Sequence, residues 1–218
     1  MENFSNVFQN YNYEHPELIG PQKTPVKLKG KWNQKYFPSS HPITLELACG
    51  RGEYTIGLAE RHPNRNFIGI DIKGARMYQG AKYALEHELS NTAFLRTRIE
   101  SIEHFFGHEE IDEIWITFPD PFLKKSKANR RLTHSFFIKK YQQFLKPGGS
   151  IHLKTDARPL FDFTLEEARR LPQLEIVKYN KDIYADTLPH PDLEIKTYYE
   201  KMHLERGRRI TYIEMALI

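Results

Sequence analysis

The chain has 218 residues, of which 39% are hydrophobic and 28% are charged, and its formal net charge is +4. This length and hydrophobic content suffice for one α/β domain with a buried core, and they exclude a disordered or fibrous chain. The single cysteine, Cys49, excludes an internal disulfide framework and a zinc site made only of cysteines. No stretch of about eighteen apolar residues occurs, and the first residues lack the layout of a secretory signal. We therefore expect a cytoplasmic protein without a membrane segment.

Residues 1–40 show no sustained hydrophobic periodicity and contain several prolines and aromatic residues. We expect them to form a basic and aromatic arm that packs on, or reaches out from, a main domain of residues 41–218, with regular structure beginning at Ile43. The arm holds a group of lysines with no acidic residue among them, namely Lys23, Lys27, Lys29, Lys31 and Lys35.

From residue 43 onward, apolar segments alternate with helical patterns. The predicted strands are residues 43–48, 66–72, 92–97, 111–118, 150–154, 174–179 and 210–217. The predicted helices are residues 54–60, 75–89, 133–145 and 160–170, with a short helical piece near 102–106 and a turn at 147–149. Because the strands are too apolar to be half exposed, the pattern predicts a doubly wound, mostly parallel α/β sheet with helices on both faces.

In such a sheet, ligands bind beyond the carboxyl ends of the strands. Gly50 and Gly52 follow the first of these strands and let the backbone approach a ligand, but Thr55 stands where a pyrophosphate cradle would have a third glycine. Glu46, near the end of the same strand, can meet a cation. Asp71 follows the next strand at about the spacing typical of an acid that binds ribose hydroxyls. Together they suggest a nucleoside cofactor without a diphosphate, such as S-adenosylmethionine, although a tight turn and a helix cap are the structural alternatives.

Two further strand ends carry acids. Prolines on both sides of Asp120 restrict the backbone, so the direction of that carboxylate is set in advance. Asp156 follows the strand at 150–154. Directly after Asp120, residues 124–131 contain five cations and no acid, and Arg206, Arg208 and Arg209 form another basic cluster. These clusters favour a polyanionic substrate such as nucleic acid, although each alone is also compatible with a solvated surface.

The order of these motifs resembles the bacterial tRNA (guanine-N7-)-methyltransferase family over about residues 45–206. The matching segments are residues 46–52, 69–71, 118–121, 124–131, 154–156 and 197–200. The resemblance implies a class I, Rossmann-like enzyme that depends on S-adenosylmethionine. It also implies that the substrate is tRNA and that the product is 7-methylguanosine in the variable loop.

The same resemblance implies residue roles. Asp120 is expected at the methyl-transfer site, where it acts by position and charge, because guanine N7 carries a lone pair and no proton. The residues expected to bind the cofactor are Glu46, Gly50, Gly52, Asp71, Arg98, Ile99 and Asp120. The residues expected to bind the substrate are Lys124, Arg130, Arg131, Asp156, Thr197, Tyr198, Tyr199 and Glu200. No metal and no obligate protein partner are implied, and the protein is expected to be a monomer or a homodimer.

Three positions depart from the family pattern. Ala48 stands at the first glycine of the turn, Phe122 at a position that usually holds tryptophan, and Arg98 at the acid that contacts adenine. Backbone amides near Arg98, or the side chain of Glu100, can take over that contact. We expect Ala48 to be tolerated, because its side chain is small.

Several alternatives stay open on the sequence alone. Thr197-x-x-Glu200 is also the pattern of a helix capping box, which needs no substrate. The chain can instead methylate an exocyclic amine of another RNA or DNA base, methylate a small molecule, or bind RNA without activity.

Overall fold

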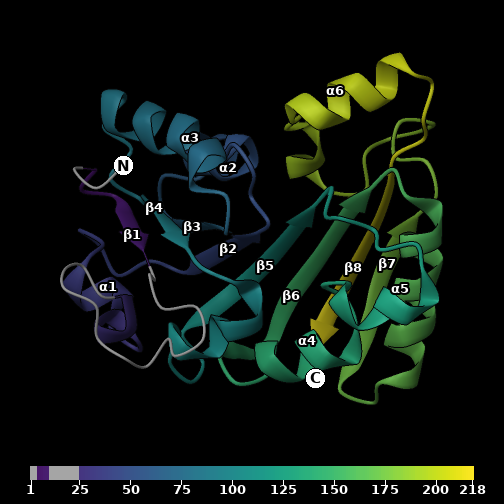
Figure 1. Ribbon diagram of the computed structural model, residues 1–218, viewed down its shortest axis with the longest axis horizontal. Helices are drawn as coiled ribbons and strands as arrows, with labels where there is room; N and C mark the ends of the chain where they lie inside the picture. Colours follow the sequence, from purple (N-terminus) through teal and green to yellow (C-terminus); the bar gives the residue numbers. More distant parts are fainter. Residues whose placement is uncertain (1–3, 10–24) are drawn as a thin grey trace.

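The computed structural model describes residues 4–9 and 25–218, and one eight-stranded sheet runs through it with helices on both faces (Figure 1). The strands are β1 (Val7–Gln9), β2 (Ile43–Leu47), β3 (Asn66–Asp71), β4 (Thr92–Arg96), β5 (Ile111–Thr117), β6 (Leu145–Thr155), β7 (Leu174–Asn180) and β8 (Thr211–Leu217). The α-helices are α1 (Trp32–Lys35), α2 (Glu53–Arg61), α3 (Gly74–Glu86), α4 (Ser135–Tyr141), α5 (Arg158–Arg170) and α6 (Tyr198–Glu205). The 3-10 helices are η1 (Pro25–Leu28), η2 (Ile99–His104), η3 (Lys125–Arg130) and η4 (Pro191–Glu194).

The order of the strands in the sheet is β1-β4-β3-β2-β5-β6-β8-β7. Only β8 runs antiparallel to its neighbours, β6 and β7, and the other adjacent pairs of described strands are parallel. The predicted doubly wound, mostly parallel sheet is therefore confirmed. No helix in residues 4–9 and 25–218 is long and apolar enough to cross a membrane.

Alternation of side chains along the central strands divides the core between the two faces of the sheet. Leu45 and Leu47 of β2 belong to a buried cluster that includes aromatic residues of α4 and α5, such as Phe137 and Phe161. On the other face, Trp115 of β5 packs with side chains of α2. Burial on both faces explains why the strands read as nearly continuous apolar runs in the sequence.

Regular structure begins before Ile43, contrary to the prediction. β1 pairs in parallel with β4 at the sheet edge. Trp32 of α1 is fully buried, and its indole Nε1 donates to the carbonyl of Phe105 at 2.9 Å. The described parts of the expected arm therefore pack on the main domain. Lys23 lies outside the described residues, and the division of the chain at residue 40 stays a prediction.

Two other boundaries differ from the predicted ones. The predicted turn at residues 147–149 lies within β6, where Gly148 has a φ of +75° and the pairing with β5 shifts register. The strand is therefore longer than expected, and a bulge interrupts it. α6 was not among the predicted helices, because its eight residues are fewer than the roughly 11–18 over which a helical period is read.

The strand order reverses at β2. From β2 the chain proceeds through β3 to β4 in one direction, and β5 and β6 extend the sheet in the other. At such a reversal the loops after the two central strands diverge and leave a crevice, which is where open α/β sheets bind ligands. The fold therefore places the segments after β2 and β5 on either side of one opening.

The turn between β2 and α2 contains two glycines in the left-handed region, Gly50 with a φ of +55° and Gly52 with a φ of +75°. A Cβ added to Gly52 would lie 2.6 Å from the ring of Phe94, which is completely buried, whereas one added to Gly50 meets no atom within 4 Å. Gly52 is therefore needed for packing, and Gly50 leaves room at the opening.

We predict that Gly52→Ala destabilises the protein more than Gly50→Ala. Both substitutions place a Cβ in the left-handed region, which costs about 1–2 kcal/mol. Only Gly52→Ala adds a clash in a packed core, worth roughly 1–3 kcal/mol more. Chemical denaturation of both variants measures the difference, and equal losses would contradict this reading of Gly52.

Candidate functional site

A cavity of about 1170 Å³ opens beyond the carboxyl ends of the central parallel strands. This volume exceeds the roughly 300–1,000 Å³ of a pocket for one small ligand, so it can take two molecules side by side. Many of the residues singled out from the sequence line it, namely Glu46, Gly50, Asp71, Arg98, Ile99, Asp120, Arg130, Asp156, Thr197 and Tyr199. The structure therefore brings together the segments after β2, β3, β4, β5 and β6.

Glu46 forms part of the cavity wall although its side chain is almost fully buried. It accepts hydrogen bonds from the backbone N–H of Thr55 at 2.8 Å, from the Thr55 hydroxyl, and from the Thr117 hydroxyl at 2.8 Å. Burial raises the pKa of Glu46 to about 7, against the lowering effect of these hydrogen bonds. A nearby cationic ligand would favour the carboxylate form.

Asp71 ends β3 and closes the turn that follows β2. Its Oδ2 accepts from the backbone N–H of Gly50 at 3.0 Å, and its Oδ1 accepts from that of Lys73 at 2.8 Å. Glycine at position 50 leaves open space over this turn, because a Cβ there would meet no atom. The turn is thus held by a carboxylate that itself faces the cavity, and a polar ligand can lie directly against its backbone.

The segment around Asp120 is held from behind by Arg131. The Arg131 guanidinium donates to the carbonyl of Pro121 at 3.2 Å and to that of Phe122 at 3.0 Å, and it lies 4.4 Å from the centre of the Phe163 ring. Asp120 itself is exposed and lines the cavity. Its carboxylate therefore projects from a loop whose neighbouring carbonyls are fixed.

Residues with strained backbone conformations also line the cavity. Among the described residues, the non-glycine residues with positive φ include Ala48, Phe118 and Phe122, and all three line the cavity. A left-handed conformation is costly for a bulky residue and persists only where the surroundings enforce it. Ala48 thus takes the conformation that a glycine would adopt more easily, as expected for a substitution that is tolerated.

The first turn of α6 lies against the glycine turn at the edge of the cavity. Its first residue, Tyr198, donates its backbone N–H to Glu53 Oε2 at 2.8 Å, and the Tyr198 ring lies 4.4 Å from the Arg51 guanidinium. Thr197 Oγ1 accepts from the backbone N–H of Glu200 at 3.2 Å, which is the contact of an N-cap. Thr197 is therefore an N-cap, while the Glu200 carboxylate, which a capping box would direct to the Thr197 N–H, contacts Tyr184 and Lys154 instead. Thr197 lines the cavity as well.

Glu200 does not reach the cavity, because its side chain is fully buried against Lys154. Lys154 Nζ lies 2.7 Å from Glu200 Oε2 and donates to the carbonyls of Leu193 and Ile195 at 2.9 and 3.0 Å. The Tyr184 hydroxyl donates to Glu200 Oε1 at 2.6 Å. Burial lowers the pKa of Lys154 to about 8 against the opposing effect of Glu200. This ion pair fastens α6 and the segment before it to the end of β6.

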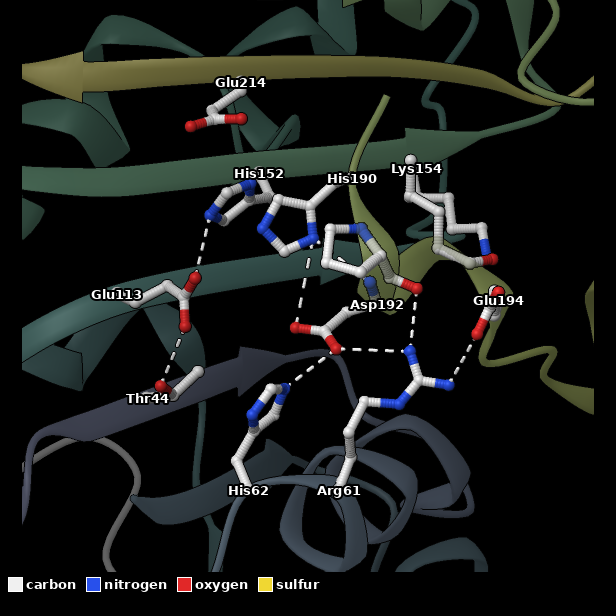
Figure 2. Close-up of polar contacts among 12 residues, drawn as sticks. Thr44, Arg61, His62, Glu113, His152, Lys154, His190, Asp192, Glu194 and Glu214 are labelled. Carbon is white, nitrogen blue, oxygen red and sulfur yellow. Dashed lines mark hydrogen bonds and ion pairs between the residues drawn. The ribbon is translucent and has the colours of Figure 1, made fainter. Parts of the chain in front are cut away.

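A second polar network holds the segment before α6 to α2. Figure 2 shows Arg61 at the end of α2 and His62 directly after it reaching Asp192, with His62 Nε2 2.8 Å and Arg61 Nη1 3.4 Å from Asp192 Oδ1. Behind them, Glu113 contacts His152 at 3.0 Å. Burial acts to raise the pKa of Glu113, but His152 and then Arg65 and Thr44 outweigh it and lower the pKa to about 2. Asp192 thus ties the segment before α6 to the C-terminal end of α2.

Five of the residues predicted for the site do not line the cavity, and their positions show why. Gly52 is enclosed by Phe94. The side chains of Arg131 and Glu200 bond within the protein as described above, and the Tyr198 ring stacks on Arg51. Lys124 is exposed and immediately precedes η3. Arg131 and Glu200 therefore hold other parts of the site in place from behind its wall.

The cavity also contains residues that the predicted set lacks. They are Met202, His203, Lys181, Arg158, Arg208 and Arg209 among others. His203 stacks on Phe118 with ring centroids 5.9 Å apart, and its Nδ1 lies 3.6 Å from Asp156 Oδ2. The two arginines after α6 were visible as a charge cluster, whereas His203 and Lys181 carry no motif that could have marked them.

Cys49 is a buried part of the cavity wall. Burial, followed by the charges of Glu46 and Asp71, raises the pKa of its thiol. A protonated thiol is a poor nucleophile, so Cys49 is inert here. Within residues 4–9 and 25–218, no group of three or more His, Cys, Asp and Glu side chains is placed to hold a metal ion.

Known proteins resemble this chain over nearly its whole length. A family model described as "Putative methyltransferase" matches residues 40–213. A tRNA (guanine-N(7)-)-methyltransferase of Bacteroides thetaiotaomicron is 47% identical over 219 residues, covering 100% of this chain and 82% of the relative. One from Christiangramia forsetii is 45% identical, covering 99% and 94%. The crystal structure of the 16S rRNA methyltransferase KamB has a similar fold, with a TM-score of 0.63, 12% identity, and coverage of 92% of this chain and 95% of that one.

We predict that the Lys154–Glu200 pair contributes strongly non-additive free energy. Glu200→Gln leaves the Lys154 ammonium buried without a counter-charge, which costs about 3–5 kcal/mol of stability. Adding Lys154→Met removes that charge, so the double variant loses less than the sum of the single losses. Denaturant unfolding of the four proteins measures the coupling.

The exposed pair Arg158–Asp162 is a matched control, because its atoms lie 2.8 Å apart at the protein surface. Asp162→Asn is expected to change stability by less than about 1 kcal/mol. Additive losses at Lys154 and Glu200 would show that the buried pair does not anchor α6.

Proposed function

We propose, since the chain belongs to the tRNA (guanine-N(7)-)-methyltransferase family, that it transfers a methyl group from S-adenosylmethionine to N7 of a guanosine in tRNA. The observation that carries this proposal is the cavity shared by the Gly50 turn and Asp120, which follow adjacent strands of the sheet. A donor over the turn then faces a base held beside Asp120. We place the target guanosine in the variable loop, as the sequence resemblance implies.

The residues at the ends of β2 and β3 suit the proposed methyl donor. The open backbone at Gly50 and the carboxylate of Asp71 can take its nucleoside, and the cationic part of the donor favours the charged form of Glu46. When bound, S-adenosylmethionine supplies an electrophilic methyl group. Arg98, Ile99 and Glu100 all line the same cavity, which supports placing the adenine contact at this segment.

The proposed methyl transfer requires alignment of the two reactants rather than transfer of a proton. Guanine N7 has an in-plane lone pair and no proton, so no general base is needed. Holding the two reactants in line can lower the barrier by up to about 7–11 kcal/mol. In our proposal Asp120 accepts hydrogen bonds from the N1 and N2 donors of guanine, and its charge stabilises the ring as it becomes cationic. Asp156, Thr197 and Tyr199 complete the base site from the opposite wall.

The direct test is incubation of the protein with labelled S-adenosylmethionine and unmodified tRNA, followed by digestion to nucleosides. We expect the label in 7-methylguanosine, and tRNA with its variable-loop guanosine replaced should stay unlabelled. Label on an exocyclic amine would identify an amino-methyltransferase instead. RNA binding without any label would identify a binding module. The cytoplasmic location and the oligomeric state stay predictions from the sequence.

We predict that Asp120→Asn lowers turnover far more than donor affinity. Loss of one preorganised electrostatic contact to the reacting group typically costs about 10²–10³ in kcat. The dissociation constant for S-adenosylmethionine, measured by calorimetry, should change by less than about threefold. Glu166→Gln, an exposed acid on α5, is the control and should change neither quantity. An equal loss in turnover and in donor affinity would instead make Asp120 chiefly a residue for donor binding.

A further inference from the structure

Three basic side chains from the C-terminal part of the chain line the cavity and have no role in the proposed function, namely Lys181, Arg208 and Arg209. We propose that they form a phosphate-binding rim for the RNA strand that carries the target guanosine. This inference rests on the proposed function, and it assigns a second set of backbone contacts in addition to the basic stretch after Asp120.

The fold brings these residues together from separate segments. Lys181 follows β7, and Arg209 lies two residues before β8, which pairs antiparallel with β7. The backbone N–H of Ile183 donates to the carbonyl of Ile210 at 2.9 Å and holds the two segments side by side. Gly207, with a φ of +69°, turns the chain after α6 so that Arg208 reaches back toward Asp156. The rim therefore lies in the segments that follow β7 and precede β8, where the paired strands hold them side by side.

The rim adjoins the expected base site through one ion pair. Arg208 Nη1 lies 2.5 Å from Asp156 Oδ2, and Asp156 is the acid expected to hold the guanosine. β8 begins where β6 ends, because Thr155 pairs with Thr211 (Figure 1). A phosphate bound at the rim would therefore belong to the target nucleotide or to its immediate neighbour.

The cations of the rim are available to a phosphate. The Arg208 side chain is 51% exposed and that of Arg209 is 80% exposed, with Arg209 Nε 3.5 Å from Asp182 Oδ2. Ion pairs at such exposure are worth about 0–1 kcal/mol. A phosphate that accepts two hydrogen bonds from a guanidinium can therefore replace the carboxylate partner, or bind beside it, at little cost. The guanidinium fork also has further N–H donors that suit phosphate oxygens.

Charge is distributed in the cavity as an RNA nucleotide requires. Two of the acidic groups that line it, Asp120 and Asp156, match the hydrogen-bond donors of a base. The basic side chains that line it include Arg130 of η3, in the segment after β5, and the rim, in the segments after β7 and before β8. Phosphate contacts of this kind fix the register of a nucleic acid, while the base is read elsewhere.

The test measures equilibrium tRNA binding as a function of salt for the Lys181→Ala/Arg209→Ala protein. Each lost phosphate contact should reduce the slope of log K against log [salt] by about 0.7, so two should reduce it by about 1.4. The affinity advantage of the unaltered protein should therefore shrink about sevenfold between 50 and 200 mM salt. The affinity for S-adenosylmethionine and the melting temperature should stay unchanged.

The matched control is Arg169→Ala/Arg170→Ala. These two exposed arginines end α5, shortly before β7 begins, whereas Lys181 follows the last residue of β7. The arginines and Lys181 therefore lie at opposite ends of the sheet. They should leave the salt slope unaltered. If the rim variant also keeps the unaltered slope, the proposal fails, and if it loses donor affinity instead, the rim binds the carboxylate of the donor. Failure of the proposed function is distinct, since it shows as no methylation by the unaltered protein.

Discussion

The buried carboxylate of Glu46 joins the three elements on which the cavity depends. It belongs to β2, and it accepts hydrogen bonds from Thr55 in α2 and from Thr117 at the end of β5. Thr117 immediately precedes the segment that carries Asp120, so one side chain relates the glycine turn to the proposed methyl-transfer site. A carboxylate with three donors can remain in a core where an unpaired one would be very unfavourable. The raised pKa of Glu46 shows that the compensation is incomplete, which leaves the group responsive to a cation.

The part of the cavity wall formed by the start of α6 depends on a second buried charge. Lys154 points from β6 into the space beneath α6, and there it pairs with Glu200 and donates to two carbonyls of the preceding segment. Neither side chain has any exposed surface. Such a pair contributes little net stability, but it tolerates only one arrangement, because any shift leaves a charge unpaired. The position of Thr197 and Tyr199 on the cavity is therefore set by residues that do not touch a ligand.

The part of this site that lies at the ends of strands could be predicted from the sequence. Apolar runs locate the parallel strands, and the acids after them had to meet at one edge, as Asp71, Asp120 and Asp156 do. The rest depends on contacts between distant residues. Lys154 and Glu200 are separated by 46 positions, and nothing in their local sequences indicates mutual burial. β1 and α1 were missed for a related reason, since segments of three and four residues are too short to show a period. Tertiary packing of Phe8 and Trp32 determines their structure.

The segment after β5 shows how this site can work without a proton-transferring group. Prolines flank Asp120, Arg131 holds the carbonyls of Pro121 and Phe122, and Phe118 and Phe122 adopt left-handed backbone angles. Each of these features restricts where the carboxylate can lie. A reaction at guanine N7 gains from such restriction, because its barrier lies in bringing a lone pair and a methyl group into line in a dry site. Strain in the loop is thus the cost of a fixed direction, and the hydrogen bonds from Arg131 to the carbonyls of Pro121 and Phe122 hold the strained segment in place.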